Sequence, residues 1–436
     1  MSTRGFPAVT SSVADVRDSQ PSRQLGRKLA FMAVATLGAA AAFANAAVNI
    51  THTRAPHLAL AIDPDDPVAL VRNAELGRAS AGAGDPSGAS LLAIAQRSVA
   101  RLPLNGPALR LYGLSSATSA DLEATREQMR VSDMMERRDL GAQLWLIENA
   151  VEENDISRAL RHYDRALRVD EASRALLYPA LTNAMNSALI RERFAPYLRN
   201  NPPWLASFLR FAVSTTRQPV ALARLARENG GWPQGAAFSS LDTELLARLT
   251  TNGDFEEAAE HFRGIEEADP SILTRLRLTD ASTDWRWAPI SWQPFQTDGI
   301  ETFVLAGPQG GNTVEIEAQV EAGFKGAVAR KFLALKPGHY RVSARMRAED
   351  HTRQDTVRWT MECLAKEADE QATNKFTLMR ETLALTEALD LSAAFEVPQD
   401  CTVQRLLISI ETLVTTRYVS LVLERAEVEP IAPVGL

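Results

Sequence analysis

The chain has 436 residues, of which 45% are apolar and 23% are charged, so it is long enough for two or three folded domains and too apolar to be disordered. Its net charge of −7 argues against a general nucleic-acid-binding protein. Residues 1–54 nevertheless carry six basic and two acidic side chains, and no lysine occurs between Lys28 and Lys325. We therefore expect a basic N-terminal segment followed by two regions of different composition.

The N-terminus contains an apolar run that follows a cluster of positive charge. The basic residues Arg23, Arg27 and Lys28 precede residues 29–48, which are long enough to cross a bilayer core at about 20 residues. Positive charge before such a run places the preceding tail, residues 1–28, in the cytoplasm. We predict a single-pass anchor in a bacterial inner membrane, with most of the chain in the periplasm. A signal peptide cleaved near Ala44-Asn45-Ala46 and a buried helix of a soluble protein are the alternatives.

Residues 55–277 have the periodicity of α-helices and repeat at an offset of about 33 residues. Apolar positions recur every three or four residues, and few stretches are rich in β-branched side chains. At an offset of 34, Thr125, Met129 and Ser132 align with Ala159, Tyr163 and Ala166; a further step of 99 aligns Ala258 and Phe262 with Ala159 and Tyr163. The sequence therefore predicts stacked helix pairs.

The best-defined unit carries a turn at Gly253-Asp254-Phe255, the packing residues Ala258 and Phe262, and a closing Asp269-Pro270. Residues 155–170 repeat this pattern without the final proline. This pattern resembles the tetratricopeptide repeat. The resemblance implies that Ala159, Tyr163, Ala166, Ala258, Phe262 and Pro270 pack the repeats, and that a concave surface receives a segment of an envelope protein. The alternative is a spacer without a ligand.

Two details of the helical region are less regular. Residues 172–238 contain Pro196, Pro202-Pro203 and Gly230-Gly231, which we expect to divide the segment into short helices. His162 and His261 lie next to repeat packing residues, where we expect them at the surface.

Residues 278–436 change to the two-residue alternation of β-strands. Strands are expected at 301–305, 313–320, 328–335, 339–347, 356–363, 392–397, 403–411 and 417–428, with a turn at Pro337-Gly338. Many short amphipathic strands joined by tight turns are typical of an antiparallel β-sandwich or jelly roll. The predicted fold class is therefore multidomain, an α-helical repeat superhelix followed by an antiparallel β-sandwich.

Residues 335–347, with Pro337-Gly338 followed by Tyr340, resemble a strand pair of jelly-roll carbohydrate-binding modules. The succession of anchor, helical repeats and sandwich resembles accessory proteins of bacterial polysaccharide synthesis and export. These resemblances imply a non-catalytic scaffold that holds a polysaccharide or an envelope protein. A purely structural scaffold and a glycan-modifying enzyme are the other hypotheses.

Sugar rings present apolar faces edged by hydroxyl groups, so a sugar site needs exposed aromatic and polar side chains together. The candidate aromatic residues are Trp285, Trp287 and Trp292, of which the first two share a side if the segment is extended. A basic strip of Arg341, Arg345, Arg347 and Arg358 suits uronic or pyruvylated sugars. The alternatives are that the tryptophans fill the junction between helices and strands or the sandwich core, and that the arginines pair with carboxylates such as Glu362.

The two cysteines, Cys363 and Cys401, form no metal-ligand pattern. In an oxidising compartment they are a candidate disulfide, and two buried thiols are the alternative. We find no phosphate-binding glycine loop, nucleophile elbow or zinc-binding helix motif. We therefore expect neither an enzyme nor a metal or cofactor site.

Overall fold

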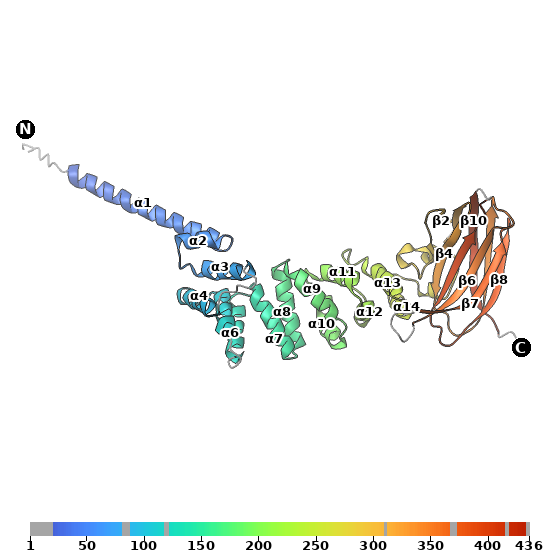
Figure 1. Ribbon diagram of the computed structural model, residues 1–436, viewed down its shortest axis with the longest axis horizontal. Coiled ribbons are helices and arrows are strands. Elements are labelled where there is room, and N and C mark those ends of the chain that lie inside the picture. The colour runs from blue at the N-terminus through green and yellow to red at the C-terminus, as the bar shows by residue number, and fades with distance from the viewer. Residues whose placement is uncertain are drawn as a thin grey trace, which may run out of the picture. The chain divides into compact units, whose positions relative to one another are not determined.

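The computed structural model describes residues 21–80, 88–116, 122–308, 312–366, 373–414 and 418–432. These residues form fourteen α-helices, three short 3-10 helices and ten β-strands, and the chain divides into two compact units, Met1–Asn149 and Ala150–Leu436 (Figure 1). Residues 1–20 of the predicted cytoplasmic tail lie outside the described residues. The predicted fold class, helices followed by an antiparallel sandwich, is confirmed.

The first unit is helical. Its elements are α1 (Pro21–Thr51), α2 (Pro56–Ile62), α3 (Pro67–Ser80), α4 (Gly88–Arg101), α5 (Gly106–Ser116), α6 (Leu122–Met135) and α7 (Leu140–Glu152), the last of which crosses the unit boundary. Within α1, Met32–Thr51 is long and apolar enough to span a membrane, and only 6% of this window is buried. By length and composition a signal sequence meets the same criteria, whereas the low burial does not fit the third hypothesis, a buried helix of a soluble protein.

A buried ion network joins the helices of the first unit. Arg110 on α5 is 9% exposed, and its Nε lies 2.7 Å from Oδ2 of Asp139. Its Nη2 donates to Oε1 of Glu75 on α3. Gly106 allows α5 to approach α6, because a Cβ at this position would lie 2.8 Å from Cβ of Glu136. A buried arginine with two carboxylate partners fixes the register of the three segments.

The second unit begins with seven helices, which Figure 1 shows in succession. They are α8 (Ile156–Val169), α9 (Ser173–Ala184), α10 (Ala188–Asn200), α11 (Leu205–Thr215), α12 (Pro219–Glu228), α13 (Leu241–Thr251) and α14 (Phe255–Arg263). Pro202-Pro203 and Gly230-Gly231 fall between helices, as expected. Pro196 lies inside α10 instead of ending a helix, because burial of Phe194 and Leu198 on either side of it holds the helix together.

The repeat offset of 99 residues appears in the backbone. Asn154 and Gly253 occupy equivalent turns with φ of 57° and 82°, and the aspartate after each donates its backbone N–H to the carbonyl five residues earlier, at 2.8 and 2.9 Å. A left-handed residue of this kind ends a helix and favours glycine or asparagine. The two turns therefore start α8 and α14 in the same way.

A connector leads from α14 to the sandwich and contains the 3-10 helices η1 (Pro270–Leu273), η2 (Ala281–Thr283) and η3 (Trp285–Trp287). The N–H of Ala334 donates to the carbonyl of Leu273 at 2.7 Å, and the rings of Phe255 and Phe332 lie 5.3 Å apart. The sandwich is therefore attached to the last helices by backbone and aromatic contacts.

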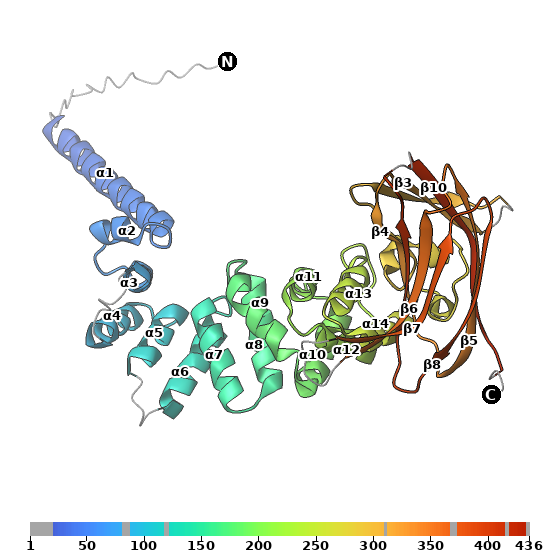
Figure 2. The same cartoon turned by 45° about the vertical axis from the view of Figure 1, so that its right-hand side comes forward.

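The sandwich has two five-stranded antiparallel sheets in the orders β1-β4-β9-β6-β7 and β2-β3-β10-β5-β8 (Figure 2). The strands are β1 (Gln293–Pro294), β2 (Ile300–Ala306), β3 (Val314–Glu321), β4 (Lys325–Leu333), β5 (Gly338–Glu349), β6 (Thr356–Lys366), β7 (Thr373–Ala384), β8 (Leu389–Val397), β9 (Gln404–Glu411) and β10 (Tyr418–Pro430). All eight expected strands are present within the described residues; residue 417 lies outside them. The edge strands β1 and β7 were not predicted.

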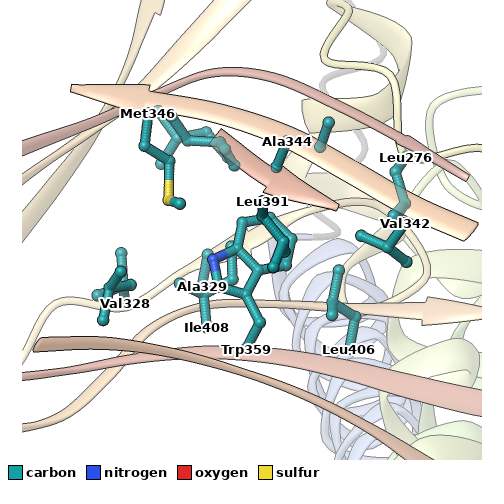
Figure 3. Close-up of a cluster of buried hydrophobic side chains, with 14 of the residues drawn as sticks. Leu276, Val328, Ala329, Val342, Ala344, Met346, Trp359, Leu391, Leu406 and Ile408 are labelled. Carbon is teal, nitrogen blue, oxygen red and sulfur yellow. The ribbon is translucent and has the colours of Figure 1, made fainter. Parts of the chain in front are cut away.

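The core lies between the two sheets. Figure 3 shows Val342, Ala344 and Met346 of β5 facing Trp359 of β6, with Leu406 and Ile408 of β9 beside it. Because alternate residues of a strand point to opposite faces, the intervening arginines of β5 lie on the outer face of their sheet. We call this outer face of the β2-β3-β10-β5-β8 sheet the charged face.

Candidate functional site

The structure separates the four arginines of the predicted basic strip. Arg341, Arg345 and Arg347 are exposed on the charged face, whereas Arg358 lies on β6 in the opposite sheet and donates from Nε to Thr382 Oγ1 at 3.2 Å. The prediction of one strip containing Arg358 is therefore wrong. Strands β5 and β6 follow each other in the chain but join different sheets. Glu362 pairs with Arg405, and with none of the four candidates.

A β-bulge in β10 adds an arginine that the sequence analysis missed. The pairing of β10 with β5 shifts between Leu423 and Arg425, so Arg425 lies directly opposite Arg345. Glu424, the extra residue of the bulge, carries a carboxylate 3.5 Å from Nε of Arg345. No carboxylate of the described residues lies within 4 Å of the Arg425 guanidinium, which is exposed.

These residues line a groove of about 550 Å³ on the sandwich, which we call the arginine groove. Its charged lining residues are Arg277, Arg345, Arg425, Glu315, Glu424 and Glu427. Arg277 lies 3.7 Å from Glu427, and Arg347 at the edge lies 3.9 Å from both Glu315 and Glu424. Three arginines and three glutamates therefore line the groove, and among the described residues Arg425 is the lining arginine without a carboxylate partner.

The neighbouring part of the charged face carries exposed rings around a polar network. Tyr418 and Phe303 are 41% and 38% exposed on β10 and β2. The Tyr418 hydroxyl donates to Gln319 Oε1 at 2.6 Å, and Gln319 Nε2 and Ser420 Oγ donate to Glu317 Oε1 at 3.3 and 3.0 Å. Desolvation and the carboxylates of nearby glutamates raise the pKa of Tyr418 above its usual value, so the phenol stays protonated.

The sequence analysis did not single out the polar side chains of β3, because outward positions that alternate with core residues are common to every strand of a sandwich. The signal was the alternation itself: Glu315, Glu317 and Gln319 occupy the outward positions of β3. Cross-strand partners on β2 and β10 depend on the strand order, which a single sequence does not show.

Two of the three candidate tryptophans are buried. Trp292 is fully buried in the sandwich core and its indole donates to the carbonyl of Leu276 at 3.2 Å. Trp287 is 6% exposed and packs against Phe262 with a centroid distance of 5.8 Å. Burial excludes Trp292 as a ligand contact. Trp287 packs in the connector, and the small exposed part of its ring lines a cavity beside η3. Trp285 is 76% exposed, since η3 is helical and turns it away from Trp287.

The predicted repeat-packing residues are mostly buried. Ala159, Ala166, Ala258 and Phe262 are at most 4% exposed, and Tyr163 is half-buried. Pro270 is exposed and begins η1, seven residues after α14 ends, so it does not close that helix. His162 and His261 are buried, and the prediction that they are surface residues is wrong. His162 on α8 and His261 on α14 each lie next to a repeat packing residue, and the buried surface of both helices extends to include the histidine.

The cysteines form a disulfide. Cys363 on β6 and Cys401 before β9 are bonded with a Cα–Cα distance of 5.6 Å, and both are fully buried. The bond links two segments of one sheet inside the core. The structure therefore contains the disulfide and not the alternative of two free thiols.

No protein-family model and no curated protein sequence matches this chain. Solved structures with a similar fold include the C-terminal family 22 carbohydrate-binding module of Clostridium thermocellum Xyn10B, at 12% identity over 33% of this chain and 88% of that one, with a TM-score of 0.24. The xylan-binding CBM22-1 domain of Paenibacillus barcinonensis Xyn10C is also similar, at 12% identity over 33% of this chain and 86% of that one, with a TM-score of 0.23.

Another similar structure joins a module of this kind to a catalytic domain. It is the Clostridium thermocellum endo-1,4-beta-D-xylanase 10B with CBM22-1 and GH10 modules, at 13% identity and a TM-score of 0.24. The match covers 32% of this chain and 26% of that one, so this chain spans about a quarter of the xylanase fragment. These likenesses concern the fold of the sandwich.

Proposed function

We propose that this protein is a non-catalytic, membrane-tethered scaffold of the bacterial cell envelope whose sandwich binds an acidic polysaccharide at the arginine groove. Its helical array, built from tetratricopeptide-like repeats, docks an envelope protein. Such a protein serves as an accessory factor in the synthesis or export of exopolysaccharide or capsule.

The observation that carries the proposal is the pair of opposed arginines, Arg345 and Arg425. Like charges directly opposite each other on neighbouring strands destabilise a sheet by up to ~1 kcal/mol. An anionic group between them relieves this repulsion, and a guanidinium fits a planar carboxylate through two parallel hydrogen bonds. A uronic-acid residue supplies that carboxylate.

The rest of the charged face supports a sugar chain as the ligand. Tyr418 and Phe303 offer ring faces to the apolar side of pyranose rings, and the Glu317–Gln319–Ser420 network offers hydrogen-bond partners to hydroxyl groups. Rings and arginines lie on the same open sheet surface, which suits a chain that crosses several strands.

The helical part and α1 support the tethering role. Helix α1 exposes Met32, Val34, Leu37, Phe43 and Ile50, and a membrane would cover these side chains. Two binding surfaces on one anchored chain raise the effective concentration of polysaccharide and partner for each other near the membrane.

One observation favours a second candidate, a structural scaffold without a sugar site. Glu424 lies near both Arg345 and Arg347, and Glu315 lies near Arg347, as expected of a solvated, charge-paired face. This candidate leaves the charge of Arg425 unexplained.

The test is a glycan-binding measurement on the full chain in detergent micelles at low salt. The probes are polygalacturonate, alginate and uncharged polymers such as xylan. We expect saturable binding of the polyuronates, weakened at least tenfold in Arg425→Gln and retained in Arg358→Gln, the matched control on the other sheet. Equal binding by the Arg425→Gln variant, or no binding of either polyuronate, overturns the proposal.

A further inference from the structure

A second cavity lies in the Ala150–Leu436 unit, away from the charged face. It has a volume of about 490 Å³ and is lined by the end of α12, the Gly230–Gly235 loop, the start of α13, the end of α14 and η3. We call it the junction pocket. Its volume falls within the ~300–1,000 Å³ of ordinary small-molecule sites.

The walls of the junction pocket carry charges of both signs, and most are already paired. Arg227 lies 2.6 Å from Glu257, and Arg286 lies 2.8 Å from Asp284 and 3.3 Å from Glu267. Arg286 also stands over the Trp287 ring at 5.0 Å. The remaining lining acids are Asp242 and Glu266. An anionic ligand would meet these carboxylates, and a cationic ligand would meet the two guanidinium groups.

Three buried polar atoms of the lining residues have no hydrogen-bond partner among the described residues. Two are donors, Nε1 of Trp232 and Nη1 of Arg227, and the third is Nδ1 of His261. Nε2 of His261 lies 2.8 Å from Asp242 Oδ1, so Nδ1 is the ring nitrogen that is left without a partner. These atoms have almost no exposed surface, so a ligand or water in the pocket reaches them only when the surrounding side chains move. Because buried polar groups left unpaired are costly, such a movement is favourable when the incoming group both accepts and donates hydrogen bonds.

From this lining we infer that the junction pocket binds a neutral sugar, as a free monosaccharide or disaccharide or as the end of a glycan chain. Hydroxyl groups accept from the indole and guanidinium, donate to carboxylate, pair with imidazole in either role, and carry no charge that either set of walls would repel. Aromatic side chains of the lining, Trp232, Phe238 and Trp287, provide the apolar surface that a sugar ring requires.

The glycine loop leaves room for such a ligand. Gly230, Gly231 and Gly235 have φ of 74°, 104° and 126°, and no atom lies within 4 Å of a Cβ built at any of them. The first two end α12, where Gly231 donates to the Ala226 carbonyl at 2.8 Å. The loop thus follows a path that favours glycine, and all three glycines belong to the lining of the pocket.

Three matched sugars test the predicted selection against charge. Binding of D-glucose, D-glucuronate and D-glucosamine to the full chain in micelles is measured by saturation-transfer NMR and calorimetry, with D-galactose, L-rhamnose and cellobiose as further neutral probes. At least one neutral sugar is expected to bind tenfold more tightly than both charged ones. Tighter binding of a charged sugar, or no binding of any neutral one, overturns the inference.

Two variants locate the binding. Ser239→Trp fills the pocket from its exposed rim and Glu266→Ala removes an exposed acceptor, so neither removes a buried contact. Both are expected to weaken the neutral sugar at least tenfold, whereas Ser157→Trp, on the exposed face of α8, leaves it unchanged. Unchanged binding in Ser239→Trp shows that the sugar binds elsewhere and overturns the assignment.

The junction pocket and the arginine groove are separable in the same measurements. Arg425→Gln is expected to weaken polyuronate binding at least tenfold and to leave binding of the neutral sugar unchanged, and Ser239→Trp is expected to show the reverse pattern. A xylo- or cello-oligosaccharide of four units that binds more tightly than the disaccharide identifies a chain end, and equal affinity identifies a free sugar. If no polyuronate binds at the arginine groove, the junction pocket can still be tested with neutral sugars, and if no neutral sugar binds at the pocket, the groove can still be tested with polyuronates.

Discussion

Arg345 of β5 and Arg425 of β10 lie directly opposite each other across two neighbouring strands of the sandwich. The bulge at Glu424 creates this arrangement, because it turns Arg425 to the outer face and leaves the following residue, Ala426, in the core. The protein keeps an unfavourable charge pair on a well-ordered sheet. Positions of this kind are typical of binding sites, where local stability is lower than the sequence would allow.

The charge pair gives a prediction in which stability and binding change in opposite directions. Arg425→Glu replaces repulsion by attraction to Arg345, so we expect the free energy of unfolding to rise by ~0.5–1 kcal/mol. Polyuronate binding should fall at least tenfold, since the anion site is gone. Urea unfolding and glycan titration of the same preparation check both. A variant that is less stable and still binds would contradict our interpretation of the groove.

The tryptophans of the connector give a contrast between core and surface. Trp292→Ala removes a fully buried ring and its hydrogen bond to Leu276, so we expect a loss of ~3–5 kcal/mol of unfolding free energy. Trp285→Ala removes a ring that is 76% exposed and should change stability by less than ~0.5 kcal/mol. Chemical unfolding of the two variants beside the wild type checks the ranking; similar losses would mean that Trp285 is covered.

Alternation in the sequence was sufficient to predict the strands that border the core. Val342, Ala344 and Met346 alternate with polar residues, so β5 was clear from its own sequence. The edge strand β7 was not, since its described side chains are mostly exposed on both faces, as at Arg380 and Glu381. Few of its described side chains enter the core, so its sequence leaves a weak pattern, whereas the edge strand β8 alternates regularly and was predicted.

The binding site depended on information that the local pattern lacks. Arg347 and Arg358 are eleven residues apart in neighbouring strands of the sequence, yet they belong to different sheets. The prediction that Trp285 and Trp287 share one face required an extended chain, but this segment is the 3-10 helix η3. Strand order and a one-residue bulge decide which charged side chains lie next to each other, and neither can be predicted from a single amino-acid sequence.

The disulfide gives a prediction that links stability to the compartment. Its bond closes a loop with a sequence separation of 38, for which the chain-entropy model gives about 4 kcal/mol. We expect the Cys363→Ala/Cys401→Ala double variant to lose a similar amount, and a reductant to lower the unfolding midpoint of the wild type but not of the variant. Thiol titration after expression with and without export checks the compartment, since the periplasm oxidises thiols and the cytoplasm does not. Two free thiols in the exported protein would contradict it.

Lys331 of β4 makes the stability of the sandwich depend on pH. The residue is fully buried, its ammonium nitrogen lies 2.8 Å from the carbonyl oxygen of Ile290, and burial lowers its pKa from 10.5 to about 7. Between these two values the unfolded chain holds a proton that the folded chain lacks, so stability falls as the pH drops from about 10.5 to about 7 and then levels off. At ~1.4 kcal/mol per unit of pKa, the full effect is on the order of 4–5 kcal/mol.

The Lys331→Met variant tests this dependence, because it keeps the volume of the side chain and removes the titrating group. We expect it to be less sensitive to pH than the wild type between pH 7 and 10, and more stable at pH 7 by a few kcal/mol, reduced by ~1–2 kcal/mol for the Ile290 carbonyl left without a donor. Urea unfolding at pH 7, 8.5 and 10 measures the difference. The matched control is Lys325→Met on the same strand, whose exposed ammonium pairs with Glu411 and whose loss should leave the pH profile unchanged. Parallel profiles for the wild type and Lys331→Met would show that the buried amine does not change its charge on folding.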